Sequence, residues 1–80
     1  MRRAPSLHLT DAERTQLQQW ARGRRTPARL MLRATIVLLA ADRQDNRHIA
    51  TAVGTSRQTV GLWRQRFATH RLTGIVQDAP

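Results

Sequence analysis

The segment NRHIATAVGTSRQTVGLWRQRF, residues 46–67, predicts two helices separated by a very short turn. Ala50 lies four residues before Gly54, where alanine lets two helices approach and glycine permits a left-handed turn. Ser56 follows as a favourable N-cap for the second helix. Because Gly54 and Thr55 are the main separation between the helices, the two must meet at a steep angle. Since the second helix is also basic, the segment indicates a helix-turn-helix.

The second helix of this segment has two distinct faces. Val60, Trp63 and Phe67 recur at three- and four-residue steps and are expected to face the core. The opposite side carries polar side chains that suit the major groove of duplex DNA, in which arginine pairs with guanine and glutamine with adenine. The residues expected to contact base edges are Arg57, Gln58, Gly61, Leu62 and Gln65.

A second set of residues is expected to contact DNA phosphates, which positions a protein on the duplex without reading its sequence. This set comprises Ser56, Arg64, Arg66, Arg47, Arg24 and Arg25. The arginines at 24 and 25 can equally belong to an ordinary solvated loop. Arg2 and Arg3 are assigned to an N-terminal arm that enters a minor groove, although such arms can also make no contact.

The charge of the chain favours a nucleic acid as partner. Fourteen basic residues against five acidic ones give the 80-residue chain a net charge of +9. Every basic residue is arginine, whose planar side chain suits bidentate contacts to phosphate and guanine. A GC-rich genome explains the absence of lysine equally well. It does not explain the size of the excess, which implies a polyanionic partner such as double-stranded DNA.

The sequence before residue 46 predicts two more helices. Thr10 and Glu13 have the spacing of a capping box, which places the start of a helix at Asp11. Thr26 is expected to cap the next helix, with Pro27 in its first position. This second helix carries the longest apolar run and is expected to be the most buried one.

We therefore expect one small all-α domain with about four helices. The expected division is a flexible basic arm over residues 1–9, a helix-turn-helix domain over 10–70 and a C-terminal tail over 71–80. The expected helices cover residues 11–22, 27–41, 46–53 and 56–69. In the tail, Leu72, Ile75 and Val76 can fold back over the core.

No residue pattern indicates catalysis, so we expect no enzymatic activity and no catalytic residue in this chain. His8, His48 and His70 are too far apart in the sequence to indicate a metal site. Nothing indicates a cofactor or a small-molecule substrate. The longest apolar run, residues 34–41, is far shorter than the roughly 20 residues that cross a membrane, and no signal peptide is evident. We expect a cytoplasmic protein.

Several stretches carry a resemblance to a known family: LTDAER at 9–14, TPARLMLRA at 26–34, IVLLAAD at 36–42, SRQTV at 56–60 and WRQRF at 63–67. The chain resembles the N-terminal DNA-binding region of bacterial insertion-sequence transposases of the IS six-thirty type, which are related to the mariner superfamily. The likeness covers nearly the whole chain. It implies a homeodomain-like helix-turn-helix that recognises the terminal inverted repeats of the element. In the family, a linker and an RNase H-like domain with three metal-binding carboxylates follow.

The resemblance thus implies a recognition module without its catalytic domain. It would act in the bacterial nucleoid as a transposase N-terminal domain or a truncated transposase, with a homodimer or the full-length transposase as candidate protein partners. Two positions depart from the family, which often has glycine where Arg43 and Arg71 stand. If these positions need a positive φ, each arginine costs roughly 1 kcal/mol. Both changes fit relaxed selection on a remnant, and they equally fit two extra phosphate contacts.

Two other function classes stay open on the sequence. A stand-alone DNA-binding transcriptional regulator would share all the features described so far. A basic protein-interaction or membrane-surface module would instead leave bulky apolar residues exposed, and on the outer face of the last predicted helix only Leu62 is of that kind. The usual signatures of RNA-binding domains are missing.

Overall fold

The computed structural model describes residues 7–77, which form five helices and no strand. The helices are α1 (Asp11–Arg22), α2 (Ala28–Ala41), α3 (Asn46–Val53), α4 (Arg57–His70) and α5 (Leu72–Val76). The all-α prediction is confirmed, and the four expected helices are present with ends that differ from the expected ones by at most one residue. α5 is an additional helix in the segment expected to be a tail. Arg2 and Arg3, the predicted minor-groove arm, lie outside the described residues.

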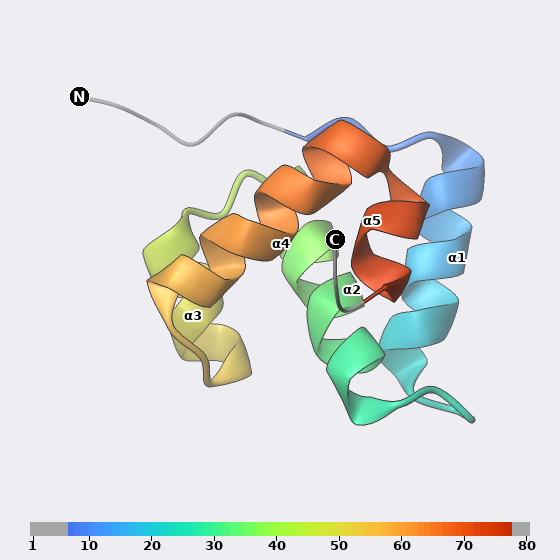
Figure 1. The fold of residues 1–80 in the computed structure, drawn as a ribbon, viewed down its shortest axis with the longest axis horizontal. Coiled ribbons are helices and arrows are strands. Elements are labelled where there is room, and N and C mark those ends of the chain that lie inside the picture. Colours follow the sequence, from blue (N-terminus) through green and yellow to red (C-terminus); the bar gives the residue numbers. More distant parts are fainter. Residues whose placement is uncertain (1–6, 78–80) are drawn as a thin grey trace.

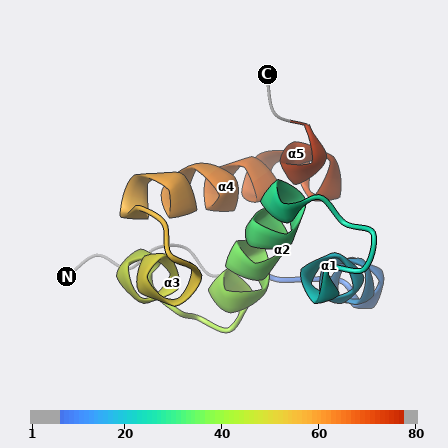
Figure 2. The same ribbon diagram turned by 90° about the horizontal axis from the view of Figure 1, so that it is seen from below.

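The central helix of the fold is α2, which contacts each of the other four helices. Figure 2 shows α2 between α1 and α3, with α4 and α5 along one side of it. Ala34, Ile36, Val37 and Ala40 of α2 are fully buried. Because several helices cover α2, its buried surface extends around more than one face.

The capping box at the start of α1 is confirmed. The Thr10 backbone N–H donates to Oε1 of Glu13 at 3.0 Å, and the Glu13 backbone N–H donates to Oγ1 of Thr10 at 3.0 Å. These bonds satisfy two of the backbone donors that a helix start leaves without a partner. Gly23 follows α1 as its C-cap and has a φ of 83°.

The prediction that Thr26 caps α2 is wrong. The helix begins at Ala28, and Pro27 is its N-cap with no side-chain hydrogen bond. Pro27 has an extended conformation, and its carbonyl already accepts from the backbone N–H groups of Leu30 and Met31. The Thr26 hydroxyl instead donates to the Arg24 carbonyl, because it lies one residue too early to reach the first turn.

Arg43 and Arg71, which stand where the resembled family often has glycine, both have a positive φ, 66° and 58° respectively. At Arg71, the end of α4 meets the start of α5 (Figure 1). Left-handed conformations are unfavourable for residues with a Cβ. Arg25 adds a third such position, with a φ of 58° in the turn between α1 and α2.

The Arg71 side chain makes contacts that offset this strain. Its Nε donates to Oε2 of Glu13 at 2.9 Å, and its Nη2 donates to Oε1 of Glu13 at 2.7 Å and to the His8 carbonyl at 2.6 Å. The guanidinium also lies 4.5 Å from the centre of the Phe67 ring. Arg71 therefore ties the end of α4 to the start of α1. Its side chain is still 42% exposed, so an extra phosphate contact by Arg71 stays a prediction.

The short helix α5 packs directly against the end of α4. Ile75 is fully buried in the core, and Gly74 is buried beside α4. A Cβ at Gly74 would overlap the backbone carbonyl of Arg66, so only glycine allows this approach. Five residues are too few for a helical period to be visible in the sequence, so α5 depends on this packing.

We expect Gly74→Ala to lower the free energy of unfolding by about 1–3 kcal/mol, because the added methyl group would push α5 away from α4. Urea unfolding measures the change. Gly61→Ala is the matched control: a Cβ there would lie 3.5 Å from Asn46 Nδ2, which is an ordinary contact. Because alanine favours a helix interior, this control should be up to about 1 kcal/mol more stable than the parent. Equal unfolding midpoints for Gly74→Ala and the parent would show that α5 does not pack as described.

Acid should weaken the link between α1 and α4. The hydrogen bond from the Arg71 side chain is the largest cause that lowers the pKa of Glu13 from 4.5 to about 2, with Thr10 contributing smaller effects. Because the folded pKa lies below the unfolded one, the stabilisation is complete above pH 4.5 and is lost as the pH falls toward 2. Urea midpoints measured between pH 6 and 2 should therefore fall more steeply for the parent than for Glu13→Gln. Parallel profiles for the two proteins would contradict this role of Glu13.

Candidate nucleic-acid interface

The turn between α3 and α4 has the geometry that the sequence predicts. Gly54 is left-handed, with a φ of 75° and a ψ of 41°. The backbone N–H groups of Gly54 and Thr55 both donate to the Ala50 carbonyl, at 2.9 and 3.0 Å. The Ser56 hydroxyl then accepts from the Thr59 backbone N–H at 3.1 Å, so Ser56 is the N-cap of α4. α3, this turn and α4 form a helix-turn-helix.

The inner face of α4 packs into the core as expected. Val60 and Phe67 are fully buried, and Trp63 is 7% exposed. Ile49 of α3, also fully buried, belongs to the same core cluster. The aromatic residues of this helix therefore serve packing, which leaves the opposite face for a ligand.

Four of the five predicted base-contact residues lie exposed on α4. They are Arg57, Gln58, Leu62 and Gln65, which we call the outer face. α4 contains no acidic residue. Figure 2 shows α4 at the edge of the molecule with α2 and α3 on the same side of it, so the outer face points away from the body of the domain. An exposed helix face without acidic side chains is suited to contact a polyanion.

Gly61, the fifth predicted base contact, is half-buried and lies beside α3. The nearest atom to a Cβ at this position would be Nδ2 of Asn46, the first residue of α3. Gly61 thus lies where α4 crosses α3, between the core face and the outer face. The structure shows a packing environment for this glycine that the helical pattern did not reveal.

Arg64 differs from its expected role. Only 6% of the residue is exposed, and its Nη1 donates to the Gln44 carbonyl and to Oδ1 of Asn46, both at 2.9 Å. Burial lowers the pKa of Arg64. The expectation that Arg64 grips a phosphate is corrected, because this guanidinium is held inside the protein. It fastens the turn before α3 to α4 and so helps to position the helix-turn-helix.

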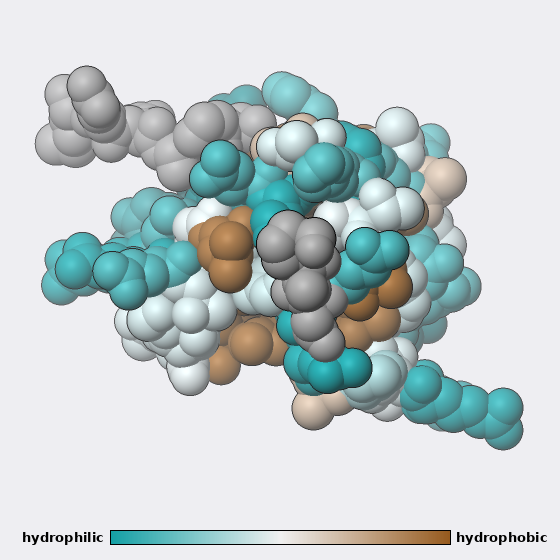
Figure 3. Space-filling view, viewed as in Figure 1, coloured by the Kyte–Doolittle hydropathy of each residue, from teal (hydrophilic) through white to brown (hydrophobic). Residues whose placement is uncertain are grey.

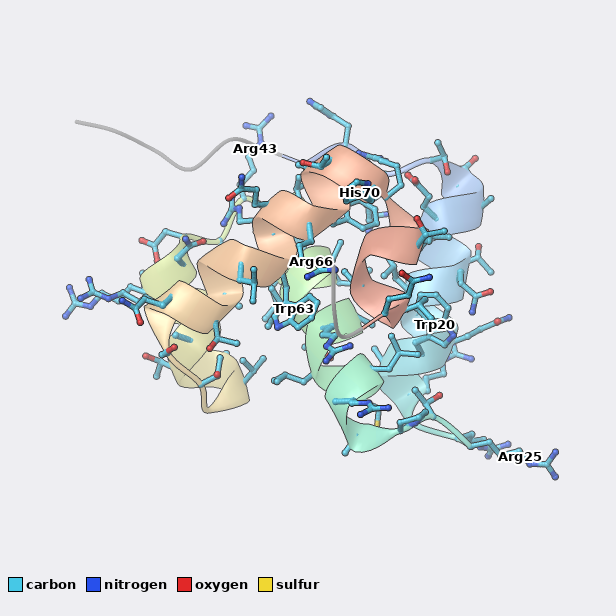
Figure 4. All side chains as sticks on the ribbon, in the orientation of Figure 1. Trp20, Arg25, Arg43, Trp63, Arg66 and His70 are labelled. Carbon is cyan, nitrogen blue, oxygen red and sulfur yellow. The ribbon has the colours of Figure 1, made fainter. Side chains whose placement is uncertain are left out.

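Arg66 is half-buried and has an internal contact as well. Its Nε donates to the Gly74 carbonyl at 3.1 Å, and its guanidinium carbon lies 5.3 Å from the centre of the Trp63 ring. Figure 4 shows Arg66 and Trp63 side by side near the middle of the molecule. The sequence predicted a phosphate contact for Arg66 and did not reveal this internal hydrogen bond, which holds the carbonyl end of α5.

Sequence reasoning missed Arg33, which completes this cluster. Arg33 is 7% exposed, lies 3.9 Å above the Trp63 ring and donates from Nη1 to the Ile75 carbonyl at 3.0 Å. The only signal in the sequence was an arginine within an apolar helix, and its acceptor lies 42 positions away along the chain. Arg33 and Arg66 together bind carbonyls at the end of α5, where positive charge is favourable.

The remaining predicted phosphate contacts are exposed and do not form one cluster. Arg47 lies in the first turn of α3, close to the helix-turn-helix. Arg24 and Arg25 lie in the turn between α1 and α2, and Figure 4 shows Arg25 pointing away from the molecule at the end remote from α3. Ser56 is exposed at the start of α4. Their contacts to phosphate stay predictions.

Within residues 7–77, no group of three or more histidine or acidic side chains is arranged to hold a metal ion. His48 instead pairs with the residue that caps its own helix: its Nδ1 lies 2.9 Å from Oδ1 of Asp45. Nor does any helix in this part of the chain have the length and apolar character needed to cross a membrane.

Comparison with protein families gives a match that covers residues 27–76, from the start of α2 to the end of α5. This span contains the complete helix-turn-helix and more than half of the chain. The chain belongs to the family of homeodomain-like domains. No curated protein and no solved structure matches it significantly.

Membership in this family accounts for the arrangement of the last four helices and supports DNA as a partner. In homeodomain-like domains the last helix of the helix-turn-helix is the one that enters the major groove, and α4 is the corresponding helix of this chain. α1 lies outside the matched residues. It packs on α2 and, through Glu13 and Arg71, is fastened to the end of α4.

Loss of the Arg64 side chain should destabilise the domain, because its guanidinium is buried and holds two segments together. We expect Arg64→Ala to cost about 2–3 kcal/mol of unfolding free energy, because two acceptors would lose a hydrogen bond to a charged donor. Gln65→Ala, the exposed neighbour, should change it by less than about 0.5 kcal/mol. Thermal or urea unfolding measures both. If Arg64→Ala proved as stable as Gln65→Ala, Arg64 would not hold α3 against α4.

Proposed function

We propose that this chain binds duplex DNA in a sequence-specific manner and recognises the terminal inverted repeats of a transposon, as the N-terminal domain of a transposase or as a truncated transposase. The observation that carries the DNA contact is the outer face of α4, which is exposed and free of acidic residues. It belongs to a homeodomain-like domain in a chain whose net charge is +9. The transposase role rests on the sequence stretches that resemble the IS six-thirty type.

In the proposed complex, α4 lies in the major groove and its outer face reads bases. Arg57 at the start of the helix would donate to O6 and N7 of guanine, and Gln58 and Gln65 would pair with N6 and N7 of adenine. The two glutamines are seven residues apart, which is about two turns of one helix face. They therefore sample separate base steps along the same groove.

Phosphate contacts would fix the helix in this position. Two exposed residues of the predicted phosphate set, Arg47 and Ser56, lie at the starts of α3 and α4. Backbone N–H groups at the start of α4 add a favourable site for a phosphate. Arg24 and Arg25, in the turn before α2, would reach the duplex at a second place.

The proposed role is recognition, without catalysis. We assign no catalytic residue, cofactor or small-molecule substrate to the chain; DNA cleavage would need the separate catalytic domain that the resembled family carries. A second copy of the chain or the full-length transposase would be the protein partner, since transposons have two ends to be recognised.

Selection from a pool of random DNA duplexes at fixed salt concentration tests this proposal. We expect a recovered motif that matches the inverted repeats flanking the gene. The double variant Gln58→Ala, Gln65→Ala should bind that motif at least roughly 30-fold more weakly, because two lost bidentate pairs at about 1–3 kcal/mol each remove about 2–6 kcal/mol of discrimination. Its binding to random duplex should hardly change, because phosphate contacts carry that affinity.

Gln18→Ala, Gln19→Ala is the matched control, because both glutamines are exposed on α1. This control should retain the parent affinity for the motif. Failure to recover any motif would contradict sequence-specific binding. A motif unrelated to the inverted repeats would contradict the transposase role while leaving specific DNA binding intact.

A further inference from the structure

Leu62 is an unusual residue on the outer face of α4. It is 49% exposed, and among residues 7–77 the one other large apolar side chain that is comparably exposed is Val76. It lies four residues after Gln58 and three before Gln65, so the three side chains follow one another along the same side of the helix. The centre of an otherwise polar face is thus occupied by a leucine.

The fold itself does not explain this leucine. The core side of α4 is already filled by Val60, Trp63 and Phe67, and Leu62 is not part of the buried cluster. Helix propensity does not require it either, because alanine is at least as favourable in a helix. Its apolar surface would gain free energy only when a partner removes it from water.

The surroundings of Leu62 fit a nucleic acid better than a protein. Arg57 is exposed on the same helix, and α4 offers no acidic side chain. In Figure 3, each hydrophobic patch visible on the side that carries α4 is small and is bordered by residues of hydrophilic or intermediate hydropathy. Protein-binding sites are marked by larger contiguous apolar patches. Charge and patch size therefore both favour duplex DNA as the group that covers Leu62.

In the major groove of DNA, the apolar group at a base edge is the C5-methyl group of thymine. We propose that Leu62 packs on this methyl group and thereby selects a thymine between the bases contacted by Gln58 and Gln65. This inference rests on the proposed function, because it requires α4 to lie in the major groove. It gives the outer face an apolar contact flanked by two hydrogen-bonding ones.

The experiment removes one methyl group from the DNA and one side chain from the protein. A site is first selected from a random duplex pool containing thymine, and each thymine of that site is then replaced singly by deoxyuridine, which lacks only the methyl group. Dissociation constants are measured at fixed salt concentration for the parent and for Leu62→Ala. At one position, the replacement should weaken binding by the parent about three- to tenfold, as expected for one buried methyl group.

For Leu62→Ala, the same replacement at that position should have less than a twofold effect, because the methyl group has already lost its partner. Val76→Ala is the matched control, since Val76 is equally exposed at 49% but lies on α5. It should respond to deoxyuridine like the parent. Gln65→Ala should also retain the response, because glutamine reads hydrogen-bonding groups. Unchanged thermal unfolding of Leu62→Ala would show that the variant is folded.

The possible results separate this inference from the proposed function. If a motif is recovered but every deoxyuridine replacement affects the parent and Leu62→Ala equally, the methyl contact is refuted and specific DNA binding stands. Recovery of no motif would refute both. If Leu62→Ala binds the selected site as tightly as the parent, Leu62 does not touch the DNA and the inference fails.

Discussion

Burial of α2 is the constraint on which the other helices depend. Its fully buried residues, from Ala34 to Ala40, have to be covered on more than one side, and α1, α3, α4 and α5 each contribute to that cover. A domain of 80 residues has little apolar surface to spare, so each helix is needed to close the core. The crossing of α3 and α4 on α2 is what turns one face of α4 outward. The candidate DNA-binding face is therefore a consequence of how the core is closed.

The arginines of this protein form two groups, one bound to acceptors within the protein and one exposed on the surface. The net charge alone does not distinguish the two groups. Arg33, Arg64 and Arg71 direct their guanidinium groups to acceptors within the protein: carbonyls near the ends of helices, the Asn46 side chain and the Glu13 carboxylate. The planar group with several donors can bind two segments at once, which suits a small core. As a result, the charge available to a polyanion is smaller than +9 suggests, and it is concentrated on exposed residues such as Arg47 and Arg57.

Much of the fold could be predicted because the decisive signals are local. The capping box of Thr10 and Glu13, the left-handed Gly54 and the N-cap Ser56 each act within a few residues, and each is present as expected. Helical periodicity also separated the buried Val60 and Phe67 from the exposed Gln58 and Gln65. These features depend on backbone geometry and on the period of one helix, so they can be read without knowing what packs against it.

The sequence by itself thus determined the helix-turn-helix, the ends of most helices and the division of α4 into a core face and an outer face. Only the tertiary structure decided that α5 forms, that Gly61 lies beside α3, and that Arg64 is buried. Each of these depends on a partner far along the chain, such as the Gln44 carbonyl for Arg64 or the Arg33 side chain for the Ile75 carbonyl of α5. The helical period in the sequence indicates which residues share a face of a helix. Long-range packing sets which neighbour covers that face. It also sets whether an arginine is held by a carbonyl inside the protein or stays exposed to solvent.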